Sequence, residues 1–166
     1  MLRNLPPGQL KDTFLFFTRL MILAAPLYLV LVFVDLLPLQ LLVAQHSFAI
    51  MQGLGWTPVM EGAQMAVGEF QFFVSRDSTG WKSMMFLGAL IFAVPGILWK
   101  KRFIGLLGIG IVYVGNLTRV VGIVAVEQAY GLEAALFTHD VLWQFGLTGL
   151  VLTVWLTWWW WVRRDA

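Results

Sequence analysis

The sequence contains no cysteine and little charge. The absence of cysteine among its 166 residues excludes disulfides, thiolate metal ligands and a thiol nucleophile in the chain as it stands. Only 12% of the residues are charged and the net charge is +2, so the composition gives no support for nucleic-acid binding. With two histidines and no cysteine a zinc site is not expected, and we predict no cofactor.

Apolar residues, in contrast, are abundant. Hydrophobic side chains make up 60% of the sequence and the mean hydropathy is +0.80, which is too apolar for a water-soluble domain. The nine tryptophans and thirteen phenylalanines fit a lipid-facing surface with aromatic belts. We therefore predict an all-α integral membrane protein that forms a single membrane-embedded domain over residues 1–166.

Four apolar runs are long enough to cross a bilayer core of ~30 Å at a rise of 1.5 Å per residue. They predict transmembrane helices at about 14–37, 80–99, 103–127 and 139–162. The basic triplet 100–102 is predicted to form a tight loop between the second and third runs. Because this loop and the two chain ends carry basic residues, the positive-inside rule places all of them in the cytoplasm.

The region of about 38–79 is then expected on the outer side of the membrane, because two spans connect a cytoplasmic N-terminus to a cytoplasmic loop. Within this region, residues 39–53 are apolar but too short for a span, and predict an interfacial helix. The partial alternation of polar and apolar residues in 67–74 predicts a small extracytoplasmic β-hairpin.

Three polar residues reach one depth in this arrangement. Arg119 lies a rise of ~24 Å after Phe103, toward the outer end of the core. Ser78 precedes the second span and His139 begins the fourth from the same side. An arginine in such a segment costs at least ~2.5 kcal/mol on insertion scales, so it is seldom kept without a partner or a function. Asn116, three residues earlier, shares its helical face.

Each of these residues also has a purely structural interpretation. Ser78 fits the N-cap of the second span, and His139 fits an interfacial cap. Arg119 fits a snorkelling side chain or one half of an ion pair. Its candidate acidic partners are Asp77, Glu127 and Asp140.

At these positions the chain resembles the exosortase/archaeosortase family of membrane-embedded transpeptidases. The family pattern is a cysteine followed closely by glycine at the start of a span, Asn-x-x-Arg in the next span, and a histidine that opens the following one. The resemblance covers roughly residues 55–162, and the ordered set is more specific than Asn-x-x-Arg alone. The matching segments are Ser78-Thr-Gly80, Asn116-Leu-Thr-Arg119 and His139-Asp140.

The resemblance implies a cysteine-type protease and transpeptidase of a prokaryotic cytoplasmic membrane, with its active site facing outward. Its partners would be exported proteins with a C-terminal sorting signal, made of a short motif, a membrane span and a basic cluster. Residue 78 would be the nucleophile position, Arg119 the clamp on the scissile carbonyl or oxyanion, and His139 the general acid and base. The residues expected to support substrate binding are Asn116, Gly80 and Asp140.

The departure from the family pattern is Ser78, which stands where the family has its cysteine. A serine hydroxyl is essentially un-ionised at neutral pH and needs an adjacent base, so we expect this chain to be inactive. One explanation is an engineered Cys→Ser change, which we favour because small members with intact motifs keep the thiol. The other is a natural branch that uses serine or has lost activity.

The alternative function is a non-catalytic membrane scaffold or chaperone that binds C-terminal transmembrane segments through the same groove. In either case Gly115 and Gly122, beside Arg119, would leave room for a bound span. A small transporter fits less well, because the polar residues gather at one face and not at the midplane.

Overall fold

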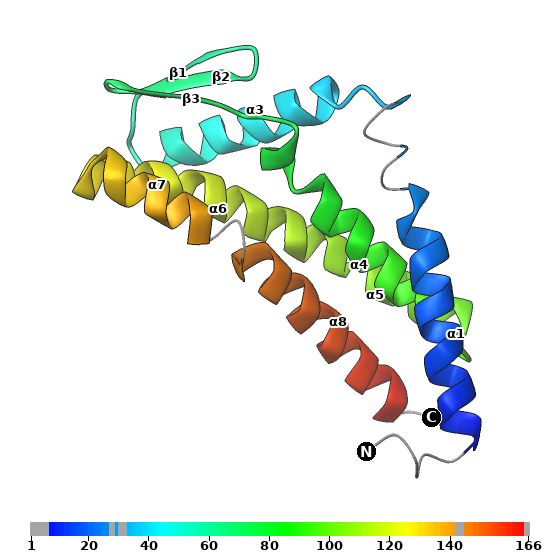
Figure 1. Cartoon of the computed structure of the whole chain (residues 1–166). Helices are drawn as coiled ribbons and strands as arrows, with labels where there is room; N and C mark the ends of the chain where they lie inside the picture. Colours follow the sequence, from blue (N-terminus) through cyan, green and yellow to red (C-terminus); the bar gives the residue numbers. More distant parts are fainter. Residues whose placement is uncertain (1–6, 27–28, 30–32, 142–144, 165–166) are drawn as a thin grey trace.

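The structure is a computed structural model and describes residues 7–26, 29, 33–141 and 145–164. It is mostly helical with one small antiparallel sheet, so the predicted combination of helices and a small β element is confirmed (Figure 1). The helices are α1 (Pro7–Ala24), α3 (Leu37–Gly53), α4 (Trp81–Ala93), α5 (Trp99–Leu106), α6 (Gly108–Tyr130), α7 (Leu132–Val141) and α8 (Leu147–Arg164). The strands are β1 (Pro58–Glu61), β2 (Gln64–Val67) and β3 (Phe70–Phe73).

The longest element is the helix formed by α5 and α6. Together they give an apolar run, Trp99–Tyr130, that alone among the described residues has both the length and the hydropathy to cross a membrane. Helix α4 is apolar but shorter. The predicted third span therefore corresponds to a longer helix than expected, and the second predicted span corresponds to a shorter one, α4.

The turn between α4 and α5 differs from the prediction. The basic triplet does not form a loop: it lies in the first turns of α5, and the chain turns at residues 94–98 instead. Pro95 has no N–H with which to continue α4, and Gly96 supplies a positive φ of 74°. The tight-loop prediction is wrong because it placed the turn at the charged residues and not at the Pro-Gly pair.

Arg102, which belongs to α5, stabilises this turn through hydrogen bonds. Its guanidinium is buried and donates hydrogen bonds of 2.6–3.2 Å to four carbonyl oxygens at and after the end of α4. These oxygens belong to Ile91, Phe92, Val94 and Ile97. The last carbonyls of a helix have no partner within the helix, so Arg102 satisfies groups that would otherwise remain unpaired.

The predicted fourth span corresponds to parts of two helices, α7 and α8. Helix α6 ends at Gly131, whose φ of 85° turns the chain back, and α7 then packs along α6. His139 lies in the last turn of α7 and does not open the final helix, so that prediction is wrong. Helix α8 begins only at Leu147. The predicted first span is also shifted, since α1 starts at Pro7, and part of the rest of that prediction lies outside the described residues.

The sheet is a three-stranded meander in the order β1-β2-β3, so the predicted hairpin is part of a larger unit. Each turn has two residues and begins with a glycine at positive φ, Gly62 (61°) and Gly68 (60°), as tight hairpin turns require. Helix α3, predicted at 39–53, is found at Leu37–Gly53 and buries Val43 and Met51 completely against the sheet and α6.

Two separate hydrophobic cores lie along the long helix. One is at the end that carries the sheet, α3 and α7, which we call the sheet end; it includes Met65, Val120 and Val124. The other is at the end where α1 begins and α8 finishes, which we call the terminal end; it includes Leu87 and Val151 (Figure 1). The functional candidates lie at the sheet end.

Replacement of Arg102 by glutamine tests the cap on α4. Four carbonyl oxygens lose a charged donor, so the variant should lose at least ~2 kcal/mol of unfolding free energy. The measurement is thermal unfolding of the detergent-solubilised protein. Lys100→Gln is the control, because Lys100 is exposed on the same helix; equal losses in the two variants would contradict the cap.

Candidate active site

The segment that connects the sheet to α4 contains Ser78. It folds as a single turn of 3₁₀ helix, η2 (Asp77–Thr79). The Ser78 side chain is half-buried and its Oγ lies 3.0 Å from Oγ of Ser75. The Ser78 N–H donates to the Ser75 carbonyl oxygen at 3.0 Å. The N-cap of α4 is Gly80, with no capping side chain, so the N-cap interpretation of Ser78 is wrong.

Two buried polar side chains of α6 hold this turn through its backbone. Asn116 Nδ2 donates to the carbonyl oxygen of Ser78 at 2.9 Å, and Arg119 Nη2 reaches the same oxygen at 3.5 Å. Asn116 is completely buried and Arg119 is 5% exposed. The spacing of three residues puts both on one face of α6, and that face fixes the position of residue 78.

Gly80 is required by the same contact. Its φ is +74°, a conformation that side-chain-bearing residues rarely adopt. A Cβ at this position would lie 2.9 Å from Cγ of Asn116. The glycine two residues after position 78 thus allows the turn to approach Asn116 closely enough for the hydrogen bond.

Ser78, Arg119 and His139 line one cavity of about 320 Å³ at the sheet end. Strand β3 forms one wall, and α6 and α7 form the others. Apolar side chains make up much of the remaining lining: Phe70, Phe72, Phe73, Leu132 and Leu136. Three residues that are far apart in the sequence therefore line one cavity, and their individual chemical roles remain predictions.

His139 is half-buried in this wall. Its Nδ1 lies 3.3 Å from Oδ1 of Asp140, which is exposed. A carboxylate beside Nδ1 favours the tautomer that carries its proton there and leaves Nε2 able to accept one. Of the acidic residues considered as partners of Arg119, Asp77 forms an ion pair of 2.6 Å with Lys82.

Arg119 also lines a second cavity, of about 380 Å³, among α6, α7 and α8. Gly122 opens onto it and has no atom within 4 Å of the position of a Cβ among the described residues. Gly115 lines the same cavity, but a Cβ there would meet Leu150 of α8. That the two glycines leave room for a bound span stays a prediction. Arg119 thus lies between the two cavities.

The described residues contain no group of three or more acidic or histidine side chains placed to hold a metal ion. His46, the second histidine, lies on α3, and its Nδ1 is 2.8 Å from the hydroxyl of Tyr113. This hydrogen bond ties α3 to α6.

Two features of the site were missed in the sequence. Ser75, three residues before Ser78, contacts its hydroxyl, and the spacing of two serines by three was a visible signal for such a turn. The aromatic residues of β3 were assigned to a surface hairpin, and nothing in their pattern indicated that they line the cavity.

This fold and site define a helical protein in which a serine, an arginine and a histidine line one cavity beside a helix long enough to cross a membrane. A family model described as "Transmembrane exosortase (Exosortase_EpsH)" matches residues 9–159. The match covers most of the chain, so the protein belongs to the transmembrane exosortase family and is a membrane protein. Searches of curated proteins and of solved structures give no significant match.

Replacement of Gly80 by alanine tests the close approach of this glycine to Asn116, and Gly96→Ala serves as the control for backbone strain. Gly96 has the same φ of 74° but no atom within 4 Å of its Cβ position among the described residues, so Gly96→Ala introduces strain alone. Strain of this kind costs ~1–3 kcal/mol. We expect Gly80→Ala to lower the thermal unfolding midpoint clearly more than Gly96→Ala, and equal shifts would contradict the close approach to Asn116.

Proposed function

We propose that this chain has the architecture of a cysteine-type membrane protease and transpeptidase, in which residue 78 occupies the nucleophile position. The observation that carries the proposal is the single cavity shared by Ser78, Arg119 and His139. Membership of the exosortase family supports the reaction class. The serine in place of a thiol leaves this chain inactive.

In the reaction of a thiol form, the thiolate at position 78 attacks the scissile carbonyl carbon. The tetrahedral intermediate carries its negative charge on the former carbonyl oxygen, where the guanidinium of Arg119 stabilises it. His139 gives a proton to the departing amine as the C–N bond breaks, and a thioester remains. An acceptor nucleophile or water then attacks the thioester, gives a proton to His139, and releases the thiolate.

Asn116 has a different role from Arg119. Its side chain is completely buried and its Nδ2 is bonded to the Ser78 carbonyl oxygen. Asn116 therefore positions the turn that carries residue 78, and Gly80 permits that position. Arg119 reaches the same oxygen at a longer distance and also faces both cavities.

The serine is the reason for the inactivity that we propose. The Oγ of Ser78 lies next to the hydroxyl of Ser75, which is not a base. A thiol has a much lower pKa than a hydroxyl, so a nearby cation and the N-terminus of α4 can produce a thiolate but not an alkoxide. The geometry thus suits cysteine chemistry at position 78.

The two cavities suit two parts of a sorting signal. The cavity that Gly122 opens onto lies among three helices and would receive the apolar span of the substrate. The cavity beneath β3 would receive the short motif and the scissile bond, with Arg119 at the boundary. We expect exported proteins with such C-terminal signals to be the substrates.

For the membrane, we propose about four spans, with the terminal end in the cytoplasm and the sheet end outside. Basic residues of α5 and α8 lie close to tryptophans at the terminal end, as the positive-inside rule and aromatic belts predict for a cytoplasmic end. The cavity would then open on the outer side of a prokaryotic cytoplasmic membrane.

The alternative is a scaffold that binds C-terminal transmembrane segments without cleaving them. The native presence of Ser78 would favour it, since the cavities remain while the nucleophile is weak. In that case a thiol at position 78 would bring no chemistry.

The test is the Ser78→Cys variant, with Ser83→Cys as its control. Ser83 lies in the first turn of α4 and does not line the cavity. Each variant is reconstituted with reporter proteins that end in a motif, a span and a basic cluster from the source genome. Only Ser78→Cys should cleave a reporter and form a hydroxylamine-sensitive adduct, and Arg119→Gln in that background should slow cleavage ~100- to 1000-fold.

If Ser78→Cys is expressed normally and gives neither cleavage nor an adduct with the reporter set, the protease proposal is wrong. Retention of the same reporters by both variants, without cleavage, is the outcome that the scaffold alternative predicts.

A further inference from the structure

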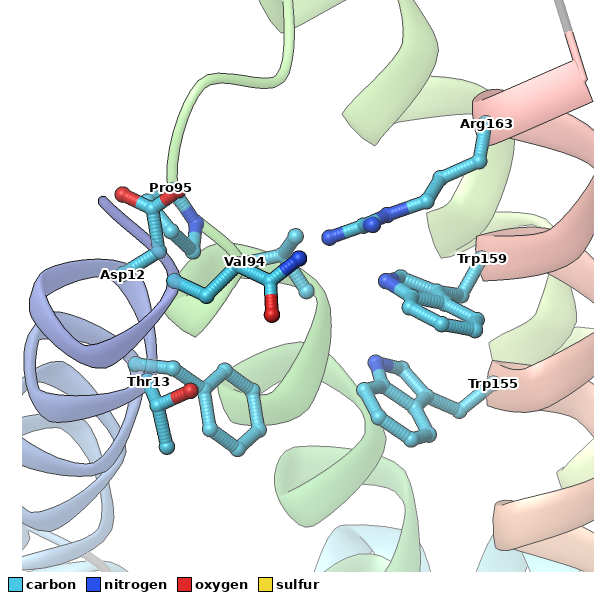
Figure 2. A pocket seen from close by; sticks show the side chains of 9 residues that line it. Asp12, Thr13, Val94, Pro95, Trp155, Trp159 and Arg163 are labelled. Carbon is cyan, nitrogen blue, oxygen red and sulfur yellow. The ribbon is translucent and has the colours of Figure 1, made fainter. Parts of the chain in front are cut away.

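A cavity of about 420 Å³ lies at the terminal end, away from the sheet end that carries the candidate active site; Figure 2 shows its lining. It is enclosed by α1, by the turn after α4 and by α8. None of the residues in the proposed reaction lines it. Its lining residues are Gln9, Asp12, Thr13, Phe16, Val94, Pro95, Trp155, Trp159 and Arg163.

Helix α8 supplies hydrogen-bond donors to this cavity. Figure 2 shows the guanidinium of Arg163 pointing into it, with the indole nitrogens of Trp155 and Trp159 on the same side. The guanidinium carbon lies 4.7 Å from the centre of the Trp159 ring, which orients the cation. No carboxylate of the described residues lies within 4 Å of Arg163.

Trp155 gives an independent sign that a ligand belongs here. Its Nε1 is buried and has no acceptor among the described residues. Buried donors in folded proteins nearly always have a partner, and the described residues supply none for this N–H. An acceptor inside the cavity would satisfy it together with Arg163.

The opposite wall carries a negative charge. Asp12 and Thr13 of α1 lie across the cavity from Arg163 (Figure 2). A simple anion would be attracted by Arg163 but repelled by Asp12. A ligand that carries a phosphate at one end and an ammonium with free N–H groups at the other would match both walls.

The surroundings place this ligand at the surface of a bilayer. Tryptophan and basic side chains gather at this end of α8, and such residues sit at headgroup depth. The flanking side chains of α1 are exposed and apolar: Leu10 (55% exposed), Phe14 (71%) and Phe17 (58%). Acyl chains could lie along them while the headgroup enters the cavity.

We propose that this cavity binds the headgroup of phosphatidylethanolamine. Arg163 and the Trp155 indole N–H hold the phosphate, and Asp12 accepts hydrogen bonds from the primary ammonium. Phosphatidylcholine has no N–H to donate to Asp12, and phosphatidylglycerol has no cation for it. The inference stands on this cavity alone and is independent of any reaction at position 78.

The test is native mass spectrometry of the purified full chain with equimolar phosphatidylethanolamine, phosphatidylcholine and phosphatidylglycerol. The protein should retain phosphatidylethanolamine with about tenfold higher affinity than either of the others. Arg163→Gln should lower retention of all three lipids. Arg164→Gln is the matched control, because Arg164 stacks on Trp160 at 5.5 Å but does not line the cavity.

Asp12→Asn isolates the ammonium contact. It should abolish the preference for phosphatidylethanolamine over phosphatidylglycerol while leaving phospholipid bound. Equal retention of the three lipids by the unaltered chain, or equal effects of Arg163→Gln and Arg164→Gln, would overturn the proposal. Competition by inorganic phosphate that is as strong as that by glycerophosphoethanolamine would also overturn it, in favour of a simple phosphate site.

Discussion

The architecture of the site depends on the contact between one face of α6 and the carbonyl oxygen of Ser78. Asn116 and Arg119 both direct side-chain N–H groups to that oxygen from inside an apolar helix. Buried donors of this kind are expensive unless they are satisfied, so the contact fixes where the turn after β3 can lie. With the turn in this position, residue 80 must be a glycine, α4 begins directly after it, and β3 forms a wall of the cavity.

The polar residues were the most predictable part of the molecule. Ser78, Asn116, Arg119 and His139 could be selected because polar groups within apolar segments need an explanation, and the structure brings Ser78, Arg119 and His139 to one cavity. Helix boundaries were less predictable, because they depend on tertiary contacts. The end of α4 is set by Arg102, which binds its carbonyls from the next helix, and hydropathy does not record that interaction.

The position of His139 was hard to predict for the same reason, because it depends on tertiary contacts. An apolar run across residues 139–162 predicts one helix, but the chain folds α7 back along α6 after Gly131. The histidine therefore reaches the cavity from a separate short helix, beside β3.

The two ends of the molecule also differ in chemistry. The sheet end encloses a cavity with a guanidinium and an imidazole, and the terminal end presents tryptophan and basic side chains.

The central claim is that position 78 is built to activate a thiol. Because the chain has no cysteine, Ser78→Cys introduces a single thiol, and the pH dependence of its alkylation by iodoacetamide gives its pKa directly. A nearby cation favours the thiolate, so this pKa should lie below the ~8.5 of an unperturbed cysteine and should rise toward it when Arg119 is replaced by glutamine. A thiol pKa at or above ~8.5 with Arg119 in place would contradict the account.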